Sequence, residues 1–310
     1  MCLEIFRFQH ENNPVYREFV SRLGRSIADV TNYKDIPFLP IELFKSRKIY
    51  AAQTEPELVF ESSGTTGSIP SRHLVADSTV YQQSFHQAFE LFYGPVEEYC
   101  ILALLPSYLE RGGSSLVYMV NDLIQKGGHP KSGFYLDNQS ELIGHLAELE
   151  AAGQKTLLIG VSFALLDLVE KHQFSLKHTT TVMETGGMKG RRKELVRAEL
   201  HQILTTGFGV ERIHSEYGMT ELLSQSYSDG AGIFTAPPWM KIRIRDAYDP
   251  LSYKETGRTG GVNVIDLANI YSCSFVATND LGRLHENETF EVMGRFDNSD
   301  LRGCNLLVAI

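Results

Sequence analysis

The sequence predicts an α/β fold of layered sheets with a small antiparallel β subdomain at its C-terminal end. Between residues 57 and 206, apolar runs of strand length alternate with stretches of helical periodicity, as in a parallel sheet covered by helices. After about residue 222, short segments of alternating polarity are separated by Gly, Pro, Asp and Asn, which favours antiparallel strands. We therefore expect an α/β core over 1–222, including a helical lead-in over 1–56, and a mainly β subdomain over 223–310.

Local patterns predict the elements in order. Apolar residues recur every four positions from Val15 to Ile27, behind an Asn cap and a first-turn proline, which predicts a helix there, and a short helix is expected at 41–45. Strands are expected at 57–61, 99–105, 156–160 and 179–184, and helices at 78–93, 114–126, 140–152 and 190–206, the last closed by Gly207. Further strands are expected at 241–245, 261–265 and 290–293.

Composition narrows the class of protein. The 310 residues are 43% hydrophobic and 22% charged, which excludes a disordered chain. The net charge of -9 argues against a nucleic-acid partner but allows one local anion pocket. The longest apolar run, 99–105, is far short of the ~20 residues that span a bilayer, and no export signal is visible. We expect a cytoplasmic protein with no membrane span, with free thiols and without structural zinc.

One candidate site is the segment Glu61-Ser-Ser-Gly-Thr-Thr-Gly-Ser68, which follows an expected strand. Its small residues allow backbone N–H groups and hydroxyls to surround a polyphosphate. It is not a Walker loop, because it has no lysine and no helix start directly after it. Taken alone, such a loop is more often a simple turn.

Three further segments carry polar groups of the same kind. Residues 213–221 end in Tyr-Gly-Met-Thr-Glu, where an exposed Tyr217 face can stack on a base, Thr220 can contact a phosphate and Glu221 can hold Mg²⁺. In 278–282 and 294–297, Asp280 and Arg295 offer a carboxylate and a guanidinium to ribose hydroxyls. Each segment alone is better explained as a simple turn.

Together and in this order, the four segments resemble the adenylate-forming superfamily of acyl-CoA synthetases, firefly-type luciferases and peptide-synthetase adenylation domains. The resemblance covers about residues 57 to 304. It implies the fold of the superfamily's large N-terminal domain and ATP and Mg²⁺ as cofactors. It also implies activation of a small-molecule carboxylic acid to an acyl-adenylate.

The resemblance assigns a role to single residues. The β- and γ-phosphates of ATP would be held by Ser63, Gly64, Thr65, Thr66 and Gly67, and the adenine would lie against Gly186, Gly187, Tyr217 and Gly218. Thr220 would contact the α-phosphate, Glu221 would bind Mg²⁺, and Asp280 and Arg295 would bind the ribose. Tyr108 and Met188 would lie near the acid substrate.

The C-terminal end narrows the resemblance further. Members of the superfamily usually continue about a hundred residues beyond the Gly-Arg-Phe-Asp motif into a mobile domain that carries a lysine, which we expect to be absent here. LuxE-type acyl-protein synthetases of bacterial fatty-acid reductase systems are similarly short, and residues 35–45 resemble their N-terminal signature. That branch passes its acyl group to a cysteine near the C-terminus, which implies Cys304 as acceptor; a buried packing role for Cys304 is the alternative.

The expected function is therefore that of an AMP-forming acid–thiol ligase. A fatty acid is the substrate that the LuxE-type branch implies, with aryl acids left open, and an acyl reductase or other acceptor protein would be the partner. Two alternatives stay open. The chain can be an acyl- or aryl-CoA ligase whose C-terminal domain comes from a partner chain, or a non-catalytic protein that binds a nucleotide or an acyl-adenylate.

Overall fold

The computed structural model describes residues 1–62, 69–106, 113–176, 179–186 and 195–296. The chain divides into two compact units, which we call the first unit (Met1–Glu55 with Pro238–Ile310) and the second unit (Pro56–Pro237). This grouping differs from the expected division at residue 222. The lead-in joins the C-terminal strands because its side chains bond to them, as described below.

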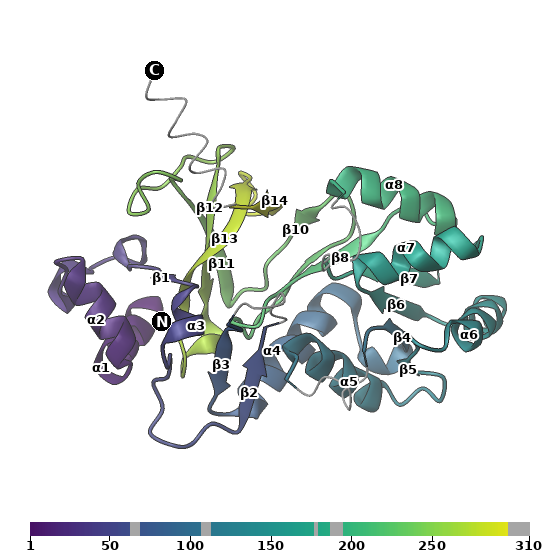
Figure 1. The fold of residues 1–310 in the computed structure, drawn as a ribbon, viewed down its shortest axis with the longest axis horizontal. Helices are drawn as coiled ribbons and strands as arrows, with labels where there is room; N and C mark the ends of the chain where they lie inside the picture. Colours follow the sequence, from purple (N-terminus) through teal and green to yellow (C-terminus); the bar gives the residue numbers. More distant parts are fainter. Residues whose placement is uncertain (63–68, 107–112, 177–178, 187–194, 297–310) are drawn as a thin grey trace. The chain divides into compact units, whose positions relative to one another are not determined.

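The second unit is built on a mainly parallel sheet with strand order β5-β4-β6-β7-β8-β9, in which only β9 runs antiparallel to its neighbour (Figure 1). Its strands are β4 (Cys100–Leu104), β5 (Gly133–Phe134), β6 (Thr156–Gly160), β7 (Thr180–Glu184), β8 (His214–Tyr217) and β9 (Ser226–Ser228). Every residue of β4 and β6 is buried, as continuous apolar strands in the middle of a covered sheet require.

Helices cover both faces of this sheet, with α4 and α5 on one side and α7 and α8 on the other (Figure 1). They are α4 (Ser78–Tyr93), α5 (Ser115–Gly127), α6 (Gln139–Ala152), α7 (Ser162–Lys171) and α8 (Arg197–Phe208), with the short η3 (Val96–Glu98). The prediction for α4 is confirmed residue by residue, and α5 and α6 lie within one residue of their expected bounds. No helix was expected at α7, because its first five residues are all buried and leave no polar face in the sequence.

The expected end of α8 was wrong. The helix continues to Phe208, and Gly209 closes it in the left-handed conformation that favours glycine. Gly207 lies inside the helix, where an added Cβ would overlap the Cβ of Val169 on α7. Its small size serves the close approach of two helices rather than the end of one.

A separate hairpin of β2 (Leu58–Glu61) and β3 (Arg72–Val75) also belongs to the second unit, as does the short strand β10 (Ile233–Phe234). The expected strand at 57–61 is confirmed. β2 and β3 pair in antiparallel fashion, and Glu61 at the end of β2 is opposite Arg72 at the start of β3. The two ends of the connecting segment therefore lie side by side.

The first unit contains an antiparallel run of strands in the order β11-β12-β13-β14, with β1 parallel to β13. These are β1 (Leu39–Pro40), β11 (Met240–Arg245), β12 (Thr259–Asp266), β13 (Phe275–Leu284) and β14 (Phe290–Arg295). The helices are α1 (Cys2–Asn12), α2 (Pro14–Arg22) and α3 (Leu43–Ser46), with η1 (Ile27–Asp29), η2 (Tyr33–Asp35) and η4 (Leu267–Asn269). Alternate residues of β11 are buried, which is the pattern of a sheet with one face on a core.

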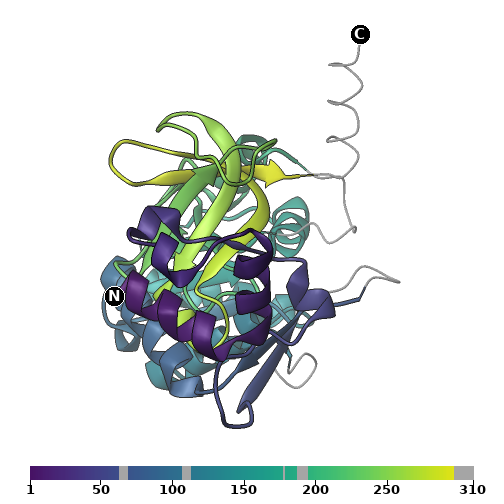
Figure 2. The same ribbon diagram turned by 90° about the vertical axis from the view of Figure 1, so that its left-hand side faces the viewer.

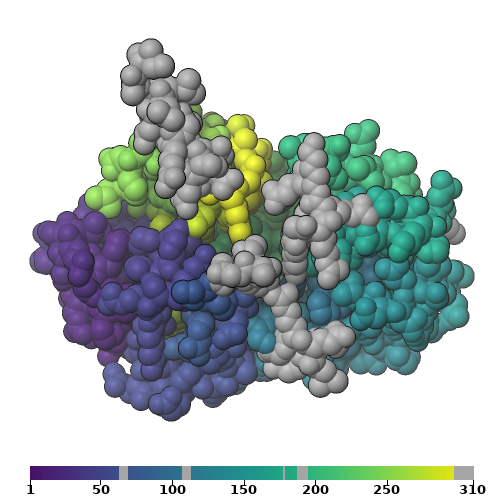
Figure 3. Space-filling model, in the orientation of Figure 1, coloured from purple at the N-terminus to yellow at the C-terminus, as the bar shows by residue number. Residues whose placement is uncertain are grey.

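The N-terminal helices pack on this sheet, as Figures 1 and 2 show. Gln9 Nε2 donates to the carbonyls of Asn269 and Ile270, and the ring of Tyr16 stacks on Phe275 at 6.2 Å. The outer sides of these helices, purple in Figure 3, form part of the surface of their unit. The Asn13 cap is confirmed, but α2 ends before Gly24, which adopts a positive φ.

No helix in the described ranges combines the length and the apolar character that crossing a bilayer needs.

Candidate functional site

The candidate site lies where strands of the parallel sheet end. Gly186 comes two residues after β7, Tyr217 is the last residue of β8, and Thr220 and Glu221 follow it. The carboxyl ends of neighbouring parallel strands meet at one edge of a sheet, which is where open α/β sheets bind ligands. Chain topology therefore gathers at one edge two motifs that are more than thirty residues apart in sequence.

The predicted phosphate loop opens from the β2–β3 hairpin. Ser62 N donates to the Ser71 carbonyl at 3.0 Å, and Ser71 N donates to Ser62 Oγ at 2.9 Å. These two bonds close the base of the loop. Residues Ser63, Gly64, Thr65, Thr66 and Gly67 lie outside the described residues.

The base of this loop is bonded to the motif that ends β8. Ser71 Oγ donates a hydrogen bond to Oε1 of Glu221, whose side chain is buried. His73, on β3, places Nδ1 2.7 Å from the carbonyl oxygen of Thr220. Two segments 150 residues apart thus converge on the predicted magnesium ligand. Sequence reasoning missed Ser71 and His73, because no local pattern distinguishes them from other polar residues on a hairpin.

A pocket of about 130 Å³ adjoins these groups within the second unit. Its lining includes Thr185, Glu216, Gly218, Thr220 and Gln225. A Cβ added at Gly218 would overlap the Glu216 carboxyl oxygen, so a larger residue here would displace the Glu216 side chain. The pocket therefore brings the end of β7 and the end of β8 together around one space.

Glu184 ends β7, directly before Thr185 in the pocket wall, and is surrounded by donors. Its Oε2 accepts from Ser162 Oγ at 3.2 Å and from the Gly186 backbone N–H at 2.7 Å. Its Oε1 lies 3.6 Å from His201 Nε2 and 3.9 Å from Arg197 Nε. Burial alone would raise the pKa of Glu184, but the hydrogen bonds and the Arg197 charge outweigh it and lower that pKa to about 2. Glu184 is therefore an ionised structural group.

The pKa of Glu216, on the neighbouring strand, is shifted in the opposite direction. Burial, with a contribution from the negative charge of Glu184, raises the pKa of Glu216 to about 8. The carboxyl that lines the pocket is consequently protonated in most molecules at neutral pH. A neutral carboxyl both donates and accepts hydrogen bonds.

Tyr217 is not placed as expected. Its side chain is only 7% exposed, and its ring meets Phe234 edge-on at 5.9 Å. The exposed stacking face that the sequence suggested is absent from this conformation. Its role against the adenine stays a prediction.

The two predicted ribose ligands lie together in the first unit. Asp280 on β13 is directly opposite Arg295 on β14 in the strand register, and Arg295 Nε lies 3.2 Å from Asp280 Oδ1. Asp280 is buried, whereas the Arg295 side chain is largely exposed. Two residues that the sequence assigned to one ligand are thus neighbours on adjacent strands.

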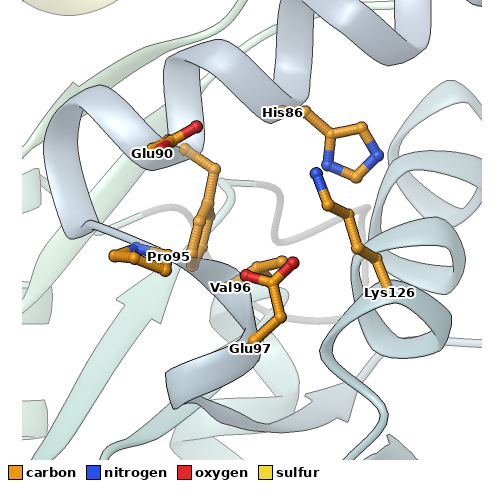
Figure 4. A pocket seen from close by; sticks show the side chains of 7 residues that line it. His86, Glu90, Pro95, Val96, Glu97 and Lys126 are labelled. Atoms are coloured by element: carbon orange, nitrogen blue, oxygen red, sulfur yellow. The ribbon is translucent and has the colours of Figure 1, made fainter.

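A smaller hollow of about 100 Å³ lies between α4, η3 and α5 (Figure 4). The Lys126 side chain extends toward His86 there, and His86 Nε2 pairs with Asp122 Oδ1 at 2.6 Å. Of the motif residues that the structure describes, none lines this hollow. The candidate site is therefore the pocket at the edge of the parallel sheet, which the motif residues Gly218 and Thr220 line.

Several predicted residues fall outside the described ranges, namely Tyr108, Gly187, Met188 and Cys304. Of the other cysteines, Cys100 and Cys273 are buried and Cys2 is half-buried. Burial raises the pKa of the Cys100 thiol to about 11 and that of Cys273 to about 12. These two thiols are inert packing groups at neutral pH.

The donor set fits Mg²⁺ held together with a nucleotide. Among the described residues, no group of three or more His, Cys, Asp or Glu side chains could hold a metal by itself. Mg²⁺ is typically bound by one or two carboxylates together with substrate phosphates. The Glu221 carboxylate, oriented by Ser71 at the base of the phosphate loop, suits that mode.

Solved structures define the class of fold. ATP-bound MatB from Rhodopseudomonas palustris superimposes with a TM-score of 0.56 at 18% identity, over 79% of this chain and 50% of that one. A long-chain-fatty-acid-CoA ligase from Archaeoglobus fulgidus gives 0.57 at 14%, over 80% and 52%. A 2-hydroxyisobutyryl-CoA ligase gives 0.63 at 11%, over 96% and 68%. The fold is that of the large N-terminal domain of adenylate-forming enzymes.

The sequence assigns the chain to a smaller group of proteins than the fold does. The protein family described as "Acyl-protein synthetase, LuxE" matches residues 1–309, and the chain belongs to it. The chain spans about half the length of the first solved structures that it matches. No curated protein sequence is significantly similar to it.

Proposed function

We propose that this protein uses ATP to convert a carboxylic acid to an acyl-adenylate and then transfers the acyl group to Cys304. The observation that carries the proposal is the hydrogen bond from Ser71 to Glu221. It joins the base of the phosphate loop to the predicted magnesium ligand, as a site for a metal-bound polyphosphate requires. Membership of the LuxE family and the fold of adenylate-forming enzymes support the same reaction.

In the first step, a carboxylate oxygen of the acid attacks the α-phosphorus of ATP. The bond from that phosphorus to the oxygen bridging to the β-phosphate breaks, and pyrophosphate leaves with the electron pair. Most of the catalytic demand is electrostatic, because negative charge shifts among phosphate oxygens. Loop N–H groups, the Thr220 hydroxyl and the Arg295 guanidinium would stabilise that charge.

Glu221 would hold Mg²⁺ in this state. When bound, Mg²⁺ neutralises charge on the phosphate oxygens and orients the leaving pyrophosphate. The protein's contribution is to keep the carboxylate in place. Ser71 does so directly, and His73 does so by fixing the Thr220 carbonyl.

In the second step, the Cys304 thiolate would attack the acyl carbonyl carbon, AMP would leave and a thioester would form. Cys100 and Cys273 are poor alternatives, since both are buried and the pKa of each thiol is raised. An acyl reductase or another acceptor protein would then receive the acyl group.

The first test is carboxylate-dependent exchange of labelled pyrophosphate into ATP, with Mg²⁺ and a panel of fatty and aryl acids. We expect Glu221→Gln to lower the exchange rate by about 10²–10³-fold, the size typical of losing one group that stabilises transition-state charge. Glu211→Gln, on an exposed residue, is the matched control and should leave the rate unchanged. Equal rates in both variants would contradict the role of Glu221.

Cys304→Ala separates the two steps. It should keep the exchange reaction but abolish formation of an acyl thioester, measured by mass spectrometry of the intact protein. Turnover that depends on CoA in Cys304→Ala would instead support a CoA ligase. ATP binding without any pyrophosphate exchange would support a non-catalytic binding protein.

A further inference from the structure

The pocket beside Thr220 contains a buried polar group without a partner. Gln225 is 4% exposed, and its Oε1 accepts no hydrogen bond in the described part of the chain. A buried amide oxygen that accepts no hydrogen bond is energetically unfavourable, because it has lost its water partners without replacement. Such an acceptor in the wall of a pocket is most simply explained by a ligand that donates to it.

A second polar group lines the same pocket. Glu216 precedes Tyr217 on β8, and Gln225 immediately precedes β9, the antiparallel neighbour of β8. Burial and the charge of Glu184 both disfavour an ionised Glu216 carboxyl when the pocket holds no cation. Thr185 adds a hydroxyl, while Leu116 and Met119 supply an apolar part of the wall.

Strand geometry turns the Glu216 side of this pocket away from the Tyr217 ring, while Gly218, which is also assigned to the adenine, lines the pocket between them. Successive side chains of a strand point to opposite faces of the sheet, so Glu216 and Tyr217 face opposite ways. If Tyr217 contacts the adenine, the space beside Glu216 belongs to another part of the reacting system. The acid must present its carboxylate near Thr220, and the rest of the acid must extend from there.

We propose that the acid activated by this protein carries a hydrogen-bond donor, a hydroxyl or an amino group, which binds Gln225 Oε1 and the Glu216 carboxyl in this pocket. The proposal rests on the proposed function and narrows the expected fatty acid to a donor-bearing acid. A hydroxyl group of the acid would donate a hydrogen bond to Gln225 Oε1 and accept one from the neutral Glu216 carboxyl. A protonated amino group instead pairs with the ionised form of Glu216.

The test compares matched acids of equal chain length with the unmodified protein. For pyrophosphate exchange, kcat/KM should be at least about tenfold higher for a hydroxy- or amino-substituted acid than for the unsubstituted acid, because a site built for a donor rejects the analogue that lacks it. Gln225→Met, of nearly equal size, should bring the ratio close to one and leave the KM for ATP unchanged. Gln202→Met makes the same chemical change on an exposed face of α8 and should preserve the ratio.

Glu216→Gln distinguishes the two donors. It should strongly reduce activity with an amino acid substrate, since the ion pair is lost, and have a small effect with a hydroxy acid. A ratio that favours the unsubstituted acid, a preference that survives Gln225→Met, or a change only in the KM for ATP would each overturn the proposal.

Acid binding measured by calorimetry, with a non-hydrolysable ATP analogue present, separates this inference from the proposed function. Preferential binding of donor-bearing acids without any exchange would uphold the pocket and refute catalysis by this chain. Pyrophosphate exchange with unsubstituted acids only would uphold catalysis by this chain and refute the proposed role of the pocket.

Discussion

At the scale of single residues, two glutamates on neighbouring strands show how surroundings decide the state of a carboxyl group. Glu184 accepts hydrogen bonds from Ser162 and Gly186 and lies near Arg197, so its pKa falls to about 2. Glu216 is buried beside the negative charge of Glu184, and its pKa rises to about 8. The folded sheet therefore keeps Glu184 ionised and keeps Glu216 neutral.

The stability of the protein should therefore fall as pH rises from about 4.5 to about 8. In that interval the folded state keeps the Glu216 proton and the unfolded state has lost it. Glu216→Gln cannot ionise and so removes this loss of stability at high pH. At about pH 8.5 we expect the variant to be ~1–2 kcal/mol more stable than the wild type, after allowance for solvent in the pocket. At about pH 5 the difference should be small.

Urea unfolding followed by circular dichroism at both pH values measures this difference. Glu199→Gln, on an exposed position of α8, is the control and should give the same small change at both. A Glu216→Gln variant whose stability relative to wild type does not depend on pH would show that the carboxyl is not held neutral. Below pH 4.5, loss of the Glu184 anion should destabilise both proteins alike, because its lowered pKa stabilises the fold only above that range.

At the scale of elements, the pair α7–α8 depends on one glycine for its close contact. Gly207 lies inside α8, facing Val169 of α7, and has no room for a methyl group. We expect Gly207→Ala to destabilise the protein by about 1–3 kcal/mol, because the helices must separate or the side chain must shift.

Gly144 in α6 provides the matched comparison. A Cβ added there meets nothing within 4 Å, so Gly144→Ala should stabilise the protein by about 0.5–1 kcal/mol through helix propensity alone. Thermal unfolding of both variants checks the pair. Stabilisation by both substitutions would show that α7 and α8 are less closely packed than the structure indicates.

At the scale of the whole molecule, the two ends of the chain build one unit. Gln9 and Asn13 on the N-terminal side bond to the segment that leads into β13, with Asn13 Nδ2 donating to the Ser272 carbonyl at 3.0 Å. The second unit is continuous, from Pro56 to Pro237. The units should therefore respond differently when the chain is cut.

A fragment of residues 56–237 should fold and unfold cooperatively, because its sheet and covering helices lie within it. A fragment beginning at residue 238 should stay unfolded alone, since the helices that cover Phe275 are missing, and should gain structure when residues 1–55 are co-expressed. Circular dichroism and thermal melts of the three preparations measure this. A folded C-terminal fragment without residues 1–55 would contradict the dependence.

The sequence by itself determined the strongly periodic elements and the order of the motifs. The α4 helix and the β6 strand have the predicted bounds, because capping, apolar spacing and β-branched content act over a few neighbouring residues. The adenylate-forming fold, inferred from four short motifs, and the LuxE family, inferred from residues 35–45 and the C-terminal end, are confirmed. The assignment of single residues to ATP, Mg²⁺ and the acid stays a prediction.

Only the tertiary structure decided which distant groups meet. Ser71 reaches Glu221, Gln225 lines a pocket with Glu216, and Asp280 faces Arg295 because of strand order and register. The helical lead-in joins the C-terminal sheet for the same kind of reason. Local sequence patterns reflect interactions along the chain, whereas these contacts depend on how whole elements pack, and the chemistry of the candidate site lies in the packing.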